Sequence, residues 1–354
     1  MVAIGLLDIP PEIQLRIAEF AQSNTAMTAL SITCRSLRSI AQSVLFETLH
    51  IDLGDPIWGS TDALLANPRI CTAVRFFQLS HPAWLSSKRS RRREQERLSI
   101  IKNLLPQMVG LRTVAIYGVT LSSEFMDAFL EIAIKNSLRV DLGWSVLPPC
   151  NISVSGASLR ILYLSFSAND SSIDSYLFLL RASATTLMVL NISIKGGEAT
   201  WLEGINLPCL LDLTISLETA ETANEVSRMS VAAFTTAQRT IQVLDLRRGV
   251  SSLPLLPDVL PHLQELHATA EQVKQLVPGR PVEAIYISCP QYNDQDWLTE
   301  AVAQSTAMVR KLYDVTVILD ARIAEKMVMM LPALESLVLS ILDDVSGSFA
   351  PTDD

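Results

Sequence analysis

One pattern of apolar and polar positions recurs along most of the chain. Apolar residues occupy positions 1, 4 and 6 of short segments, and a polar residue or proline often stands just before them, as in SLRILYLS, TLMVLNIS, PCLLDLTIS and ALESLVLS. Alternation of this kind is typical of a strand with one buried face. Helix-like stretches such as 123–134 and 321–330 lie between the segments. Each unit is therefore predicted to contain a strand, a turn and a helix.

The spacing of these segments predicts a stacked array. They begin at Phe46, Cys71, Leu111, Ser137, Leu159, Leu187, Leu210, Ile241, Leu263, Val282, Leu312 and Leu334. Most intervals lie between roughly 20 and 30 residues, near the range of leucine-rich repeats, which stack parallel strands and helices into an open solenoid. We expect an α/β fold with an irregular leucine-rich-repeat-like solenoid at 47–349 and a polar tail at 350–354. No unit carries the Asn or Cys that regular repeats place after the strand, so a plain α/β domain is the alternative.

A different pattern occupies residues 1–46. Prolines at 10 and 11 mark the start of a first helix, and Ser23-Asn24-Thr25 ends it and offers N-cap side chains for a second. A third helix follows from about Arg35. Three such short helices make a very small core, so this module is expected to need a partner or a neighbouring domain. The apolar positions are Ile13, Ile17 and Phe20 in the first helix, Met27, Leu30 and Ile32 in the second, and Leu37, Ile40, Ala41, Val44 and Leu45 in the third.

This segment resembles an F-box, the helical motif that docks onto the Skp adaptor of cullin-RING ubiquitin ligases. The family opening Leu-Pro-x-Glu is matched by Ile9-Pro10-Pro11-Glu12, and the family turn of Cys, basic, any residue and aromatic is matched in part by Cys34-Arg35-Ser36-Leu37. Leu37 stands where many members have Trp, and the linker 23–25 lacks the acidic residue often found there. The resemblance covers residues 7–51 of the 354-residue chain.

The resemblance implies partners and contact residues. It predicts binding to a Skp-type adaptor and, through it, to a cullin, with irregular repeat arrays common behind F-box segments of this fungal type. The alternative is that the helices only cap the array of a protein-interaction scaffold. The implied adaptor-binding residues are Ile9, Pro10, Ile13, Ile17, Leu30, Ile32 and Leu37.

Composition and charge restrict the remaining classes of function. The chain is 49% hydrophobic and 18% charged, which favours a folded protein, and its net charge of -9 disfavours nucleic acid as a partner. No apolar run approaches the roughly 20 residues of a membrane span, and the N-terminus lacks the basic region of a signal peptide. The 5 cysteines lack metal-ligand spacing, and four of them lie in apolar patterns. They are expected to be core residues in a reducing compartment, cytoplasmic and/or nuclear.

The segment 88–97, KRSRRREQER, concentrates positive charge in this acidic chain. It is interpreted as a solvated loop or an exposed first helical turn, with a nuclear-import or acidic-partner patch as the alternative.

No motif for catalysis, nucleotide binding or a metal site occurs, so no enzymatic activity, metal or cofactor is expected. Recognition is the chemistry that remains. Positions 4 and 6 are expected to point inward, so positions 3, 5 and 7 would face the concave side of the array. Such a polar strip with aromatic anchors suits the binding of a protein surface. The alternative is that these residues are polar only because they are exposed to water. The predicted target-binding residues at position 5 are Tyr163, Asn191, Thr214, Asp245, His267 and Tyr286, and position 7 adds Tyr117, Ser165, Ser193, Ser216 and Arg247.

Together these features predict a substrate-recognition subunit of a Skp-cullin-F-box ubiquitin ligase. Its N-terminal helices would dock on the adaptor, and its repeat array would hold an unknown protein target. The contribution to catalysis would be proximity, which raises the effective concentration of target lysines at the site of transfer.

Overall fold

The computed structural model describes residues 9–21, 24–33, 35–54, 68–81, 88–148, 159–167, 173–196, 198–219, 223–247, 249–250, 253–255, 259–287, 296–317, 329 and 331–341. The chain divides into two compact units. Unit 1 comprises residues 1–166 and 170–186, and unit 2 comprises residues 167–169 and 187–354. Each unit combines parallel strands with helices, so the α/β class expected from the alternation is confirmed.

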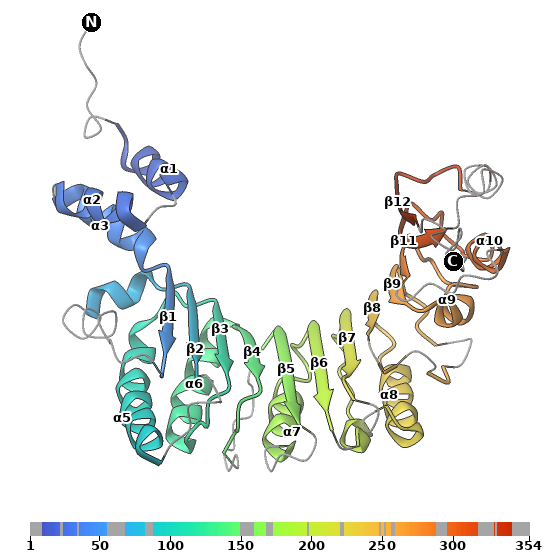
Figure 1. Cartoon of the computed structure of the whole chain (residues 1–354), viewed down its shortest axis with the longest axis horizontal. Helices are drawn as coiled ribbons and strands as arrows, with labels where there is room; N and C mark the ends of the chain where they lie inside the picture. Colours follow the sequence, from blue (N-terminus) through green and yellow to red (C-terminus); the bar gives the residue numbers. More distant parts are fainter. Residues whose placement is uncertain are drawn as a thin grey trace, which may run out of the picture. The chain divides into compact units, whose positions relative to one another are not determined.

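Three helices form a small module at the start of unit 1: α1 (Pro11–Ala21), α2 (Asn24–Thr33) and α3 (Arg35–Leu45), drawn in blue in Figure 1. They match the predicted helices. Their core consists of Ala18, Met27 and Ala41, against which partly buried residues such as Leu30 and Ile40 pack. Two of the three fully buried residues are alanines, so the module buries little apolar area. The predicted N-cap Ser23 lies outside the described residues.

The rest of unit 1 alternates strands and helices. Its strands pair in parallel in the order β1-β2-β3-β4-β5, so each strand lies beside its neighbour in sequence. Helices lie along one face of these strands (Figure 1). The elements are β1 (Thr48–Asp52), η2 (Pro68–Ala73), β2 (Phe76–Ser80), α5 (Lys88–Leu104), η4 (Leu105–Gln107), β3 (Thr113–Tyr117), α6 (Ser123–Asn136), β4 (Arg139–Gly143), β5 (Ile161–Ser167) and α7 (Ile173–Ala182), where η denotes a 3-10 helix.

Unit 2 repeats this arrangement. Its strands are parallel in the order β6-β7-β8-β9-β10-β11-β12. The elements are β6 (Val189–Lys195), η5 (Thr200–Leu202), β7 (Asp212–Leu217), α8 (Glu225–Ala237), β8 (Val243–Leu246), β9 (Glu265–Ala268), α9 (Ala270–Leu276), β10 (Ala284–Ile287), α10 (Asp296–Ala303), β11 (Lys311–Val317) and β12 (Ser336–Ile341). The predicted helix at 321–330 falls almost entirely outside the described residues.

The predicted inward positions are confirmed in β3 through β10, where positions 4 and 6 of every segment are buried. Two segment starts are wrong by three residues. The segment proposed to begin at Cys71 begins at Val74, because 68–73 form η2 and the buried strand residues are Phe77 and Leu79. The segment proposed to begin at Leu312 begins at Val309, since Leu312 pairs with Ile285 at position 4.

Backbone hydrogen bonds connect successive strands where regular repeats would use an asparagine ladder. Two consecutive N–H groups at the start of a strand donate to one carbonyl of the preceding unit. For example, Arg75 and Phe76 donate to the Glu47 carbonyl at 2.8 and 3.0 Å. This satisfies main-chain groups that would otherwise be buried without partners. The other carbonyls that accept such a pair are those of Arg75, Met188, Leu211, Gln242, Gln264, Glu283 and Arg310.

Two further expectations concern cysteines and the basic segment. Cys71 is buried, as expected of a core residue, whereas Cys209 is exposed because it lies in the turn before β7.

The basic segment 88–97 is helical from its first residue, as the start of α5, and is not a loop. Arg92 is exposed beside Glu96, but Arg97 donates to the backbone carbonyl of Leu53 and so has a structural role. No helix among the described residues is long and apolar enough to cross a membrane.

Candidate interaction surfaces

The strand face opposite the core carries the predicted target-binding residues. We call this the open face. It consists of positions 3, 5 and 7 of the strands, and each of the two units has its own open face. In unit 2, strand register places Asn191, Thr214 and Asp245 side by side on β6, β7 and β8. The same row continues through His267 and Tyr286 on β9 and β10. The remaining predicted residue, Tyr163, lies on the open face of unit 1, in register with Asp141.

Side chains on the open face of unit 1 contact one another through a hydrogen bond and a cation–π contact. The Tyr117 hydroxyl donates a hydrogen bond to Oδ2 of Asp141 at 2.7 Å. The guanidinium carbon of Arg139 lies 4.5 Å from the ring centre of Tyr163, a cation–π contact. Gly143 permits the first contact, because a Cβ there would stand 2.4 Å from Cδ1 of Tyr117. Tyr117 and Asp141 are thus hydrogen-bonded to each other, and Arg139 contacts the ring of Tyr163.

Burial and charge shift the ionisation of this pair. Burial, the hydrogen bond to Asp141 and the charge of that carboxylate raise the pKa of Tyr117 to about 12, with Arg139 opposing the shift. Burial also raises the pKa of Asp141, whereas the Tyr117 hydrogen bond and the charge of Arg139 lower it. The hydroxyl therefore stays protonated and acts as a donor at neutral pH.

Three stacked rings extend along the open face of unit 2. The His267 and Tyr286 ring centres are 3.8 Å apart with 10° between planes, and Tyr286 and Tyr313 are 4.5 Å apart with 7° between planes. Tyr313 was missed as a site residue because the segment start at Leu312 was wrong. The signal was present in Val309-Arg310-Lys311-Leu312-Tyr313, which places Tyr313 at position 5.

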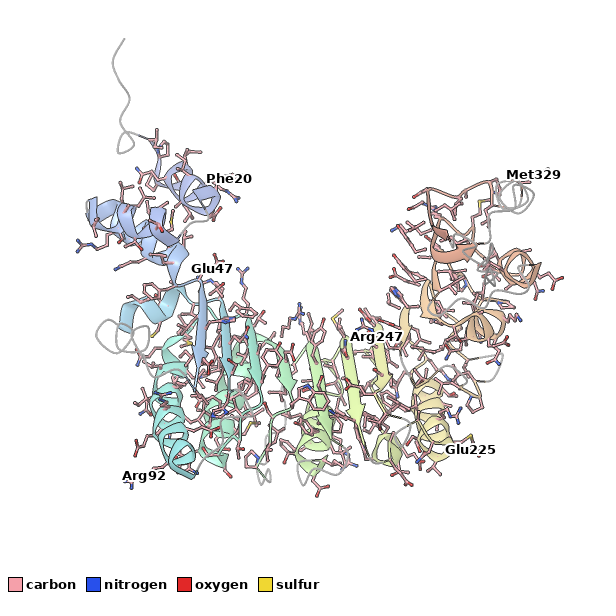
Figure 2. The ribbon with its side chains drawn as sticks, in the orientation of Figure 1. Phe20, Glu47, Arg92, Glu225, Arg247 and Met329 are labelled. Carbon is pink, nitrogen blue, oxygen red and sulfur yellow. The ribbon has the colours of Figure 1, made fainter. Side chains whose placement is uncertain are left out.

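Carboxylates gather beside these rings. Asp245 accepts from Nε of Arg247 at 2.8 Å, and Glu265 lies 2.8 Å from Nε2 of His267. Arg247, which directly follows β8, is labelled in Figure 2. The side chain of Asp212 makes no hydrogen bond or ion pair with any described residue. Burial and the charges of Glu265 and Asp245 raise its pKa, and His267 opposes this shift.

Position 5 is not uniformly hydrated. Thr214 is only 8% exposed, although it lies between Asn191 and Asp245 in the row. Its side chain makes no hydrogen bond with the described residues. At position 7, Ser193 donates to the carboxylate of Glu218. The predicted strip therefore contains one largely buried threonine, whose hydroxyl has no hydrogen-bond partner among the described residues, in addition to its more exposed polar groups.

The helical module exposes much of its apolar surface. Phe20 is 82% exposed and Ile32 is 74% exposed, and Figure 2 shows Phe20 at the outside of α1. The predicted adaptor contacts Ile13 and Ile17 are 50% and 42% exposed. Among the others, Pro10 is exposed and Ile9 and Leu30 are partly buried. Leu37, by contrast, is 7% exposed and faces the interior, so it can influence an adaptor only through the fold of the module.

The histidines lie in different strands and turns of the chain. His267 is on β9 and stacks on Tyr286, whereas His262 lies in the preceding turn. His50 stacks on Phe76 at 6.2 Å in unit 1. Within the part of the chain that the structure describes, no cluster of three or more His, Cys, Asp or Glu side chains could hold a metal ion.

Comparison with known proteins identifies no family for this chain. No protein-family model matches it, and no curated protein shows significant similarity to it.

Proposed function

We propose that this protein is the substrate-recognition subunit of a Skp-cullin-F-box type ubiquitin ligase. In this proposal α1–α3 are an F-box-like module that binds a Skp-type adaptor, and the two sets of parallel strands are an irregular leucine-rich-repeat-like solenoid that binds a protein target. The protein would have no active site and would act in the cytoplasm and/or nucleus. It would bring its target close to the enzyme that carries ubiquitin.

The observation that carries the proposal is the exposed apolar surface of the helical module. Ile13 and Ile17 lie four residues apart on α1, with the strongly exposed Phe20 three residues further. Residues at this spacing share one helix face. Large apolar side chains gathered on one helix of a small unit indicate a protein-interaction surface. Ile13 and Ile17 are among the residues that the F-box resemblance assigns to the adaptor, and Phe20 extends the same helix face.

Target binding is supported by the open face of unit 2. Its row of in-register residues combines stacked rings with one carboxylate, one amide and one threonine hydroxyl. Aromatic side chains give large contact areas at low entropic cost, and the polar groups supply specificity. This is the composition expected of a surface that binds another protein.

The adaptor proposal is tested by retention of a purified Skp-type adaptor on the immobilised full-length chain. We expect wild type to retain the adaptor and Ile17→Asp to weaken retention at least about tenfold, because a charge would be buried in the interface. Val109→Asp is the matched control, since Val109 is 67% exposed in unit 1 but lies outside the helical module. No retention by wild type, or equal retention by the Ile17 and Val109 variants, would contradict the proposal.

A second candidate function is a non-enzymatic interaction scaffold in which the helices only cap the array. It is favoured by the direct connection of α3 to β1: α3 packs against η2, and the Glu47 carbonyl binds the start of β2. In that case the module would stabilise the strands without binding an adaptor.

A further inference from the structure

We infer that the open face of unit 2 binds an arginine side chain of the target protein, between the carboxylates of Asp212, Asp245 and Glu265. This inference rests on the proposed target-binding role of the same face and specifies the chemistry that it recognises.

The three carboxylates surround one small apolar residue. Asp212, Val243 and Glu265 occupy the same register position on β7, β8 and β9, so Val243 lies between the two acids. Asp245 is two residues beyond Val243 on the same side of β8. Neighbouring strands are about 4.8 Å apart, which places the two outer acids about 10 Å apart at their backbones. A long side chain can therefore lie over Val243 and reach the carboxylates with its end.

The charges at this position are incompletely balanced. Arg247 pairs with Asp245 and His267 lies beside Glu265, but the carboxylate of Asp212 has no hydrogen-bonding partner among the described residues. Burial raises the pKa of Asp212, and the like charges of Glu265 and Asp245 raise it further. An added cation would relieve this repulsion, so the site favours a positively charged group.

A second observation independently indicates a ligand. The Thr214 hydroxyl is unpartnered although its residue is only 8% exposed. Thr214 is two residues from Asp212 on β7, and the intervening Leu213 belongs to the core, so both side chains point to the open face. The Thr214 hydroxyl makes no hydrogen bond within the described part of the chain, so its lone pairs can accept from a donor that approaches from outside.

These two acceptors distinguish arginine from lysine. A guanidinium has five N–H donors in a planar fork and can bind the Asp212 carboxylate and the Thr214 hydroxyl together. Its flat surface also stacks on rings such as that of His267. A lysine ammonium is a compact charge that is more strongly hydrated, so it satisfies this combination less well. In unit 1 the comparable acid, Asp141, already accepts a hydrogen bond from Tyr117.

The experiment measures binding of capped tripeptides to the full-length chain by ligand-observed NMR. The probes are Gly-Arg-Gly, Gly-Lys-Gly and Gly-citrulline-Gly, the last being a neutral equivalent of the first. We expect the arginine peptide to bind at least about threefold more tightly than the lysine peptide, and the citrulline peptide to bind at least about tenfold more weakly than the arginine peptide. Binding of the citrulline or lysine peptide as tight as that of the arginine peptide would overturn the inference.

Variants locate the site. Asp212→Asn and Thr214→Val should each weaken arginine-peptide binding at least about fivefold. Glu271→Gln is the matched control, because Glu271 is an exposed acid on α9 that pairs with Lys274. If Glu271→Gln weakens binding as much as Asp212→Asn, the attraction is only general and the inference is wrong.

Adaptor retention separates this inference from the function on which it rests. Asp212→Asn should retain the Skp-type adaptor as wild type does, because Asp212 is outside the helical module. Normal retention without binding of the arginine peptide would reject the inference alone. Binding of the arginine peptide without any retention of the adaptor would reject the ligase function alone.

Discussion

At the scale of single residues, glycine and tyrosine positions decide how the open face of unit 1 is built. Tyr117 can lie against β4 only because Gly143 has no side chain, and this brings its hydroxyl to Asp141. Arg139 lies on the Tyr163 ring and also opposes the shift of both pKa values. The interaction partner of a side chain on one strand therefore comes from the neighbouring strand.

The hydrogen-bonded pair of Tyr117 and Asp141 gives a prediction about the pH dependence of stability. The pKa of Tyr117 is raised to about 12, above its ordinary value of 10.0, so the folded state holds the proton more tightly. The resulting stabilisation is fully present below pH 10 and is lost as pH rises towards 12. Asp141→Asn should lower the pKa of Tyr117, because it removes the negative charge beside the hydroxyl. Tyrosinate absorbance, with Tyr117→Phe to assign the signal, measures this shift, and an unchanged titration in the Asn variant would contradict it.

At the scale of elements, the helical module separates two kinds of apolar position that look alike in sequence. Leu37 is buried on α3, whereas Ile17 on α1 is 42% exposed. Both belong to apolar stripes with helical spacing. Such a stripe indicates an apolar contact, but it does not show whether the contact is with the core of the module or with another protein. Packing of α1–α3 around Ala18, Met27 and Ala41 leaves the α1 stripe largely uncovered.

This difference in burial predicts that substitution by alanine destabilises the module strongly at Leu37 and hardly at all at Ile17. Leu37→Ala should destabilise the module by about 3 kcal/mol, since it removes buried apolar contacts and leaves a cavity. Ile17→Ala should change stability by less than about 0.5 kcal/mol, as expected for an exposed position. Hydrogen exchange of residues 11–45 measures both effects in the full-length chain. Faster exchange in the Ile17 variant than in the Leu37 variant would show that the assignment of buried and exposed positions is wrong.

At the scale of the whole molecule, each unit is built by repetition of a strand held to the next by backbone hydrogen bonds. Because two N–H groups share one carbonyl at most of the steps from strand to strand, adjacent strands keep their register without a side-chain ladder. Such arrays depend on contacts between neighbours, so their ends must be covered. The helical module precedes the first strand of unit 1.

Removal of residues 1–45 tests whether the module is a separate docking unit or a cap. We expect the shortened chain to keep a cooperative melting transition, with a decrease in melting temperature of about 5 °C or less, because Glu47 still binds β2. The adaptor should no longer be retained. Loss of the cooperative transition would instead favour the scaffold with a helical cap.

Much of the strand and helix pattern follows from sequence, but the contents of the open face do not. Alternation predicted the buried positions of β3–β10, because each side chain's direction is set by its own strand. The two wrong starts, at Cys71 and Leu312, arose where a 3-10 turn or an extra apolar residue imitated the pattern. The second error concealed Tyr313 and with it the end of the aromatic stack.

The sequence by itself determined the α/β class, the three N-terminal helices and the division of each strand into an inner and an outer side. These are local properties, encoded by residues within a few positions of one another. Only the tertiary structure decided that Leu37 is buried, that Ile17 is exposed and that Thr214 is unpartnered beside Asp212. The reason is that such surroundings come from strands and helices that are distant in sequence, and their register sets which side chains meet.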